Sequence, residues 1–316
     1  MNSGGNDRGA LYIFERDAGG VGNWGQVKKL GAFDGVDLDN YGRTVALDVD
    51  TLLVSAPRKM VVSKANGVVY LYERNQGGPD NWGYVKKLLD PDMAAYNEFG
   101  YGLAISGDTV VVGSAFEAGA GTNRGAAHIF ERNQGGPDNW GNVITLSASN
   151  PQDYAYFGGH ADIDGDTVII GAYFEDIVGT DSGAAYIFER NWGGPDNWGL
   201  VQKLIASDAD QSDWFGSPVS IQGDNVVVGA YLEDGYGINF GAAYVFGRDH
   251  GGADHWGQVQ KLGAMQPENN DFFGASTAIS GDTIVTGAYG EDSSRGAVYV
   301  YYQMQGLSLY LPLLSR

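Results

Sequence analysis

Apolar and polar positions alternate along most of the chain with the two-residue period of β-strands. Residues 101–106 place Tyr101, Leu103 and Ile105 on one side, as in a strand with one buried face. Residues 109–113 form the continuous run TVVVG, which is typical of a strand buried on both faces. The Gly-Asp pair between the two runs predicts a hairpin turn. Because no segment sustains a 3.6-residue apolar period, we expect almost no helix.

Two more strands follow in the same unit of sequence. Residues 125–132 (GAAHIFER) alternate again, and the Gly- and Pro-containing segment NQGGPDN then predicts a turn. Residues 140–146 (WGNVITL) form the fourth strand. Its counterparts WGQVKKL and WGQVQKL carry lysines that would protect an outer edge strand from pairing with other chains.

These four-strand units repeat with a period of 58 residues. The aromatic-Gly pairs that open each unit begin at Tyr41, Phe99, Phe157, Phe215 and Phe273, and the Trp-Gly pairs begin at Trp24, Trp82, Trp140, Trp198 and Trp256. A lone four-stranded sheet cannot bury both of its faces, whereas radial packing of several sheets buries them. The repeat therefore predicts an all-β fold, a β-propeller of four-stranded antiparallel blades with five 58-residue repeats; a linear β-solenoid is the second choice.

In chain order the landmarks read FG, GD, GA and GAxYxF. This order resembles the FG-GAP repeats of the integrin α-subunit propeller, and it is even more similar to bacterial FG-GAP repeat proteins, over residues 9–302. The resemblance implies that the aromatic-Gly pair begins the innermost strand of each blade. It also implies a secreted or cell-surface protein that binds or adheres rather than catalyses. Integrin-type repeats often carry a DxDxDG calcium loop between strands one and two, but here that loop is as short as ISGDT and too poor in carboxylates.

Composition narrows the function classes. The 316 residues carry 39 acidic and 19 basic side chains and a net charge of -20, which argues against a nucleic-acid partner. The absence of cysteine excludes disulfides and thiolate metal sites. No apolar run reaches the roughly 18 residues of a transmembrane helix, and the first residues lack the pattern of a signal peptide.

The acidic residues are concentrated in particular loops. In an up-and-down blade, the loops before strand one and between strands two and three open on the same side, and they hold 20 of the 39 acids. A solvated, repulsive surface explains such a rim, but clustered carboxylates also suit Ca²⁺, the one cofactor we consider. The candidate metal ligands are Glu175, Asp176 and Asp181, followed by Glu233, Asp234, Glu291 and Asp292.

Aromatic residues outside the repeat suggest a ligand surface on the same side. Trp214 precedes an aromatic-Gly pair, and the neighbouring candidates are Asp213, Tyr236 and Phe240. Such side chains stack on sugar rings or insert into protein partners. His160 is the histidine that we expect nearest to the central channel.

The sequence carries no catalytic motif of a recognised class, such as a Ser-His-Asp order, HExxH or a phosphate-binding glycine loop. We therefore expect a non-catalytic extracellular binding or adhesion module that contacts a protein or carbohydrate ligand on a cell surface through its acidic loop face. A structural spacer without a small ligand is the alternative. A glycosidase-type enzyme built on paired carboxylates is a third, weaker one.

The two ends of the chain leave the ring closure open. We expect a propeller over residues 1–306 and an apolar tail over 307–316. The first sheet has strands three and four at 9–15 and 24–30, and we favour an arrangement in which residues 274–288 supply its first two strands and close a five-bladed ring. Alternatively, the tail segment 307–314 forms the fourth strand of the last blade.

Overall fold

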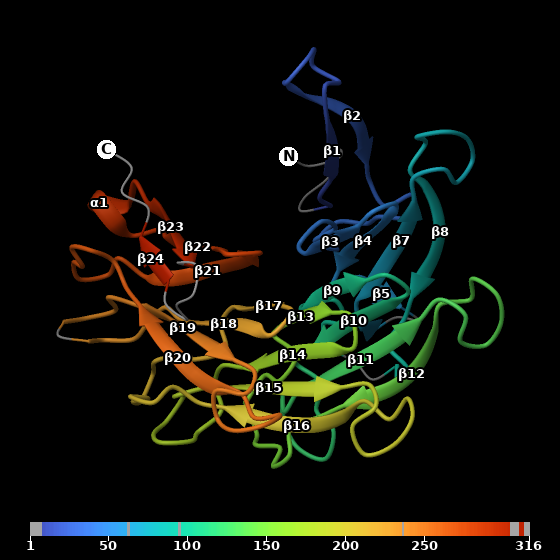
Figure 1. Cartoon of the computed structure of the whole chain (residues 1–316). Helices are drawn as coiled ribbons and strands as arrows, with labels where there is room; N and C mark the ends of the chain where they lie inside the picture. The colour runs from blue at the N-terminus through green and yellow to red at the C-terminus, as the bar shows by residue number, and fades with distance from the viewer. Residues whose placement is uncertain (1–7, 62–63, 94–95, 236, 304–309, 313–316) are drawn as a thin grey trace.

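A computed structural model describes residues 8–61, 64–93, 96–235, 237–303 and 310–312. It contains five four-stranded antiparallel sheets, in which the strands follow one another in chain order, and two two-stranded sheets, one of them at the N-terminal end. Figure 1 shows the sheets side by side in an arc, with strands β1 and β2 at one end and the C-terminal sheet at the other. The all-β propeller architecture with five repeats is therefore confirmed.

The strands of each blade, from the innermost outward, follow chain order. Blade 1 consists of β3 (Val45–Asp48), β4 (Thr51–Ala56), β7 (Val68–Glu73) and β8 (Gly83–Leu88). Blade 2 consists of β9 (Leu103–Ser106), β10 (Thr109–Ser114), β11 (Ala126–Glu131) and β12 (Gly141–Leu146). Blade 3 consists of β13 (His160–Asp164), β14 (Thr167–Ala172), β15 (Ala184–Glu189) and β16 (Gly199–Leu204).

Blades 4 and 5 complete the arc. Blade 4 consists of β17 (Val219–Gln222), β18 (Asn225–Ala230), β19 (Ala242–Gly247) and β20 (Gly257–Leu262). Blade 5 consists of β21 (Phe273–Ser280), β22 (Thr283–Ala288), β23 (Ala297–Gln303) and β24 (Tyr310–Pro312). Smaller elements are the hairpin β5 (Met60–Val61) and β6 (Lys64–Ala65) and the helical turn α1 (Glu291–Ser294). Among the described residues, no helix has the length and apolar character needed to cross a membrane.

Neighbouring blades share one hydrophobic core at each boundary. Val69 and Leu71 of blade 1, for example, pack in one buried cluster with Val110, Val112 and Phe130 of blade 2. The opposite face of blade 2 forms a second cluster with blade 3. This is why the second strand of a blade is a continuous β-branched run: both of its faces are buried.

Repeated glycines let the backbones of adjacent blades come together. Gly125 has a φ of +81° and forms a parallel bridge with Phe157 of the next blade. A Cβ at Gly113 would collide with the carbonyl oxygen of Gly158, which belongs to the next aromatic-Gly pair. Glycine is thus required where strand two of one blade meets the first strand of the next.

A repeated arginine, which directly follows the third strand of blades 1 to 4, joins neighbouring blades. Arg132 donates to Glu73 of blade 1 and to Asp108 of its own blade, each at 2.6 Å. Its guanidinium lies 4.5 Å from the ring centre of Trp140, a cation–π distance. Arg74, Arg190 and Arg248 make the same contacts at three other boundaries.

The predicted ring closure is wrong, because β22, which pairs with β21, also pairs with β23 rather than with the N-terminal strands. The N-terminal pair, β1 (Leu11–Arg16) and β2 (Trp24–Leu30), forms its own sheet. In the last blade, residues 310–312 of the predicted tail pair with β23, which is the alternative arrangement. The N-terminal sheet is consequently less covered than the blades. Trp24 is 68% exposed, whereas its counterpart Trp82 in blade 1 is 2% exposed.

Candidate functional site

The loop face is the side of the molecule formed by the loops before each first strand and between each second and third strand. The consecutive strand order places these loops on one side, as the sequence predicts. Seven of their acids are nevertheless buried, and they are the buried acids of the described residues: Asp39, Asp90, Glu117, Glu175, Asp213, Glu233 and Asp271. The loop face is thus only partly the solvated rim that we expected, because many of its carboxylates serve as internal acceptors.

Blade 3 shows the common arrangement of these buried acids. The carboxylate of Glu175, in the loop after β14, is fully buried. It accepts a hydrogen bond from the hydroxyl of Tyr186 at 2.6 Å and pairs with Lys203 of the fourth strand at 2.8 Å. Burial is the main reason that the pKa of Tyr186 is raised, and the carboxylate adds to the effect. The lysine compensates the buried charge of the glutamate.

The same arrangement recurs with variations in three other blades. In blade 5, Glu291 accepts from the hydroxyl of Tyr299 at 2.6 Å. In blade 1, Lys59 takes the place of the glutamate and pairs with the buried Asp39 at 2.9 Å. In blade 4, Glu233 pairs with Lys261 at 2.8 Å. Glu175, Glu233 and Glu291 therefore have internal partners, which are tyrosine and lysine residues at repeated positions.

The residues predicted to bind calcium are not assembled into a metal-ligand group within the described part of the chain. Asp176 accepts the backbone N–H of Asp181 at 2.8 Å, and Asp234 accepts that of Asn239 at 2.9 Å. Asp292 pairs with Arg295 at 3.0 Å. These carboxylates hold their own loops in shape, as short polar side chains in turns do.

One group with the character of metal ligands lies instead in blade 2. Oxygen and nitrogen atoms of Asp90, Glu117 and His128 lie within 4.8 Å of one another, and all three residues are buried. Burial raises the pKa of Asp90 to about 6, although a hydrogen bond from Asn97 opposes the effect. In the sequence, His128 lies within the predicted strand 125–132, and the two acids lie in the predicted acidic loops.

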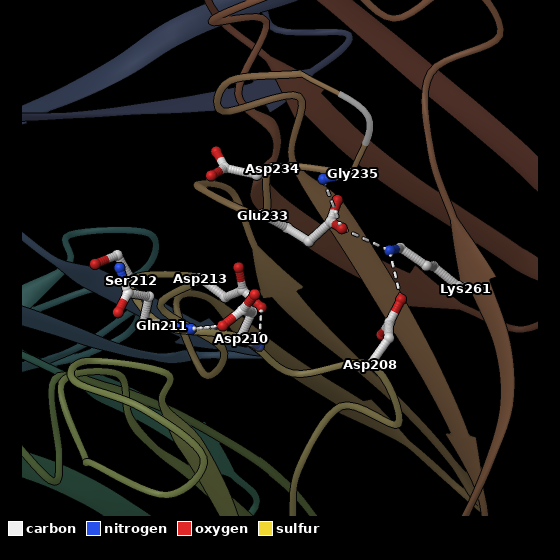
Figure 2. A pocket seen from close by; sticks show the side chains of 9 residues that line it. All are labelled: Asp208, Asp210, Gln211, Ser212, Asp213, Glu233, Asp234, Gly235 and Lys261. Atoms are coloured by element: carbon white, nitrogen blue, oxygen red, sulfur yellow. Dashed lines mark hydrogen bonds and ion pairs between the residues drawn. The ribbon is translucent and has the colours of Figure 1, made fainter.

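A large cavity at the loop face lies in blade 4. It has a volume of about 650 Å³, and its walls carry five carboxylates and one ammonium group. The charged residues are Asp208, Asp210, Asp213, Glu233, Asp234 and Lys261, and the walls are completed by Gln211, Ser212 and Gly235. Figure 2 shows Lys261 between Asp208 and Glu233, with Asp210 and Asp213 on the other side of the cavity. We call this cavity the acidic pocket.

Charge within the acidic pocket is unevenly compensated. Lys261 pairs with Asp208 at 2.7 Å and with Glu233 at 2.8 Å. Asp213 instead accepts a backbone N–H of Asp210 at 2.7 Å. Burial, together with the nearby charges of Glu233 and Asp210, raises the pKa of Asp213 to about 6, although the backbone hydrogen bond from Asp210 opposes the effect. The pocket therefore keeps a strongly negative potential near neutral pH, which attracts positive groups.

The predicted ligand residues are distributed over several structures. Asp213 lines the acidic pocket. Trp214, the next residue, contacts the rings of Tyr173, Phe174 and Tyr231. Phe240 uses its backbone carbonyl to accept the N–H of Phe273 in blade 5. Tyr236 lies outside the described residues.

His160 begins β13, an innermost strand that contacts the innermost strands of blades 2 and 4. Its Nε2 lies 3.1 Å from the hydroxyl of Ser217, and its ring lies 5.8 Å from that of Tyr173. Desolvation, and secondarily the guanidinium of Arg43, lower the pKa of His160 to about 4. The imidazole is therefore neutral at physiological pH.

Trp214 is not an isolated aromatic residue but belongs to an aromatic belt that crosses several blades. Consecutive ring contacts link Tyr101, Phe116, Tyr156, Tyr173, Phe174, Trp214, Tyr231, Phe272 and Tyr289. The position of Trp214 is also aromatic in two other units, as Tyr156 and Phe272. Comparing residue classes rather than identities across the repeats would have revealed this belt.

Comparison with known proteins places the fold in context. The chain is similar to a solved structure described as the β-propeller domain of the Trilobed protease from Pyrococcus furiosus, with an open velcro topology. The identity is 10%, the match covers 85% of this chain and 70% of that chain, and the TM-score is 0.47. No curated protein sequence matches the chain.

The family comparison matches most of the chain. The model of the FG-GAP repeat matches residues 24–72, 82–130, 140–188, 198–246 and 256–301. Each match runs from the Trp-Gly pair of one blade to the third strand of the next, in agreement with the landmarks found in the sequence. The chain belongs to the FG-GAP repeat family.

Proposed function

We propose that this protein is a non-catalytic, extracellular binding module that holds a positively charged group of a protein ligand in the acidic pocket. The observation that carries the proposal is the composition of the pocket wall, where five carboxylates face a single lysine. Lysine and arginine side chains are the commonest cationic groups on protein surfaces, and a carboxylate pair suits the planar guanidinium of arginine. Membership of the FG-GAP family supports the binding role.

A carbohydrate ligand is the second candidate, and the aromatic belt favours it. Sugar binding by stacking needs an exposed ring face. Tyr289 is 56% exposed, but Trp214 is only partly exposed and its ring is in contact with three other rings. Most of the belt is thus engaged in packing, so the acidic pocket is the better site. A spacer role without a ligand is the outcome that a lack of binding would support.

The proposal is tested with a lysine-rich peptide and the same peptide with acetylated lysines. We expect the charged peptide to bind and the neutral one not to. The variant D210N/D213N keeps hydrogen-bond acceptors in the pocket but removes two charges, and we expect it to bind about tenfold more weakly. The control is D249N/D254N, which removes two charges from exposed positions in the turn between β19 and β20, on the other side of the blade.

The control separates a site from general attraction by a protein of net charge -20. If both double variants weaken binding equally, the peptide responds to overall charge and the pocket is not the site. If the charged peptide shows no binding at low salt, the proposal of a cation-binding module is wrong. Increasing ionic strength should weaken the specific interaction as well, because exposed charges are screened.

A further inference from the structure

Three departures from the repeat meet at one point in blade 2. The position of Asp90 is alanine in the other units, at Ala32, Ala148, Ala206 and Ala264. The position of His128 is tyrosine at Tyr12, Tyr70, Tyr186, Tyr244 and Tyr299. The position of Thr145 is lysine at Lys29, Lys87, Lys203 and Lys261. Independent drift would scatter such changes over the blade, whereas here the buried Asp90 and His128 lie close together and the exposed Thr145 contacts His128.

The geometry of this space is that of a small donor set. The Nε2 atom of His128 lies 3.0 Å from a carboxylate oxygen of Glu117 and 3.2 Å from the hydroxyl of Ser114. The donor atoms of Asp90, Glu117 and His128 are all within 4.8 Å of one another. The exposed fractions of the three residues are 2%, 8% and 1%. An ion with bond lengths of about 2.0–2.2 Å holds its ligand atoms less than about 4.4 Å apart, so small side-chain movements would bring these atoms onto one ion.

The surroundings orient these groups. The other ring nitrogen of His128, Nδ1, lies 3.0 Å from the hydroxyl of Thr145, which is the residue that replaces the repeat lysine. Asp90 accepts hydrogen bonds from the side chain of Asn97 at 2.5 Å and from the backbone of Asp92 at 3.0 Å. Outer contacts of this kind fix the ring and carboxylate orientations in metal sites.

The charge balance favours a cation. In blade 3, the buried Glu175 is compensated by Lys203. In blade 2, the exchange of alanine for Asp90 adds a carboxylate, and the exchange of lysine for Thr145 removes an ammonium group. Two buried carboxylates beside a single imidazole, that of His128, are costly. A divalent ion would take the place of the missing lysine.

We propose that blade 2 binds a divalent transition-metal ion of the zinc class through Asp90, Glu117 and His128. An imidazole favours zinc over calcium, which prefers a larger shell made only of oxygen ligands. Three protein ligands leave a fourth position of the tetrahedral site for water. This site is distinct from the acidic pocket and does not depend on the function proposed for it.

The test is a titration of the chelator-treated full chain with ZnCl₂ and, separately, with CaCl₂. The comparison variant D90A/H128Y/T145K restores the residues that fit the same place in other blades, so we expect it to fold. We expect zinc to bind the natural chain with one ion per chain and to raise its unfolding midpoint. In the restored variant, we expect the zinc affinity to fall by about 100-fold or more, because two proposed ligands and the residue that orients His128 are exchanged. Zinc should then leave the unfolding midpoint of this variant unchanged.

A second variant tests whether zinc binds at exposed histidines instead. H250Q/H255Q removes the two imidazoles of the turn between β19 and β20, which are exposed. We expect this variant to bind zinc like the natural chain. The proposal is overturned if the natural chain does not bind zinc, if the restored variant binds it equally well, if H250Q/H255Q abolishes binding, or if calcium binds at this site more tightly than zinc.

Discussion

Blades 2 and 4 share one scaffold and differ in what their loop faces hold. In both, an arginine lies over the buried tryptophan that begins the fourth-strand segment, with ring-centre distances of 4.5 Å for Arg132 and 4.7 Å for Arg248. At the loop face, blade 4 has a lysine between two carboxylates beside an open cavity. Blade 2 has a histidine with two carboxylates in a closed, buried space.

This difference between blades 2 and 4 shows which positions of the repeat are constrained. Packing positions are fixed because a change in one blade opens a cavity against the next. The positions of Asp90, Glu117 and His128 meet within one blade, so exchanges there alter charge without removing the packing between blades. The binding chemistry of this family member is therefore to be sought where one unit departs from the others.

The largest effect is expected from the shared scaffold. Trp140→Ala and Trp256→Ala each remove a buried ring at a blade boundary and should each lower the free energy of unfolding by about 3–5 kcal/mol. Urea unfolding of the two variants checks this. Trp24→Ala is the matched control, since the exposed ring of Trp24 should cost less than about 0.5 kcal/mol. Unequal losses in blades 2 and 4 would show that their scaffolds are not equivalent.

A smaller effect is expected from the charge that distinguishes the two blades. Lys261→Thr gives blade 4 the residue of blade 2 and leaves Glu233 and Asp208 without their ammonium partner. We expect the free energy of unfolding to fall by about 1–2 kcal/mol, because Lys261 is partly exposed and water screens part of the loss. The same unfolding assay applied to Thr145→Ser, which keeps the hydroxyl beside His128, should show almost no change. An unchanged Lys261→Thr variant would contradict the compensating role of the lysine.

The smallest effect concerns pH and the acidic pocket. Because the pKa of Asp213 is raised to about 6, this carboxylate becomes neutral in the folded protein as the pH falls below 6. The lysine-rich peptide should therefore bind several-fold more weakly at about pH 5 than at about pH 7.5. The same raised pKa adds stability that is present at low pH and is lost as the pH rises through about 6. Asp213→Asn should flatten both dependences, and an unchanged pH profile would exclude Asp213 as their source.

Much of the fold could be predicted because strand and turn patterns are local. The period of 58 residues and the aromatic-Gly and Gly-Ala pairs located the strands and the contacts between blades. The ring closure could not be predicted, because strands β21 and β22 have the same pattern whether they pair with β23 or with the N-terminal strands. Only the backbone register settles that choice.

The candidate sites were less predictable, because burial decides what a carboxylate does. Glu175 and Asp176 are adjacent acids in the sequence, yet Glu175 is fully buried against Tyr186 and Lys203. The group in blade 2 spans a linker, a loop and a strand, so its members are far apart in the chain. The signal that could have found it is the coincidence of Asp90, His128 and Thr145 as departures from the repeat.

The central claim is that departures from the repeat mark the binding sites of this protein. Anomalous diffraction tests this claim directly for the proposed metal site in blade 2. Crystals grown with zinc and measured on both sides of the zinc absorption edge should show a peak between Asp90, Glu117 and His128. In crystals of D90A/H128Y/T145K this peak should be absent. Anomalous density confined to other places, such as the exposed histidines His250 and His255, would contradict the account.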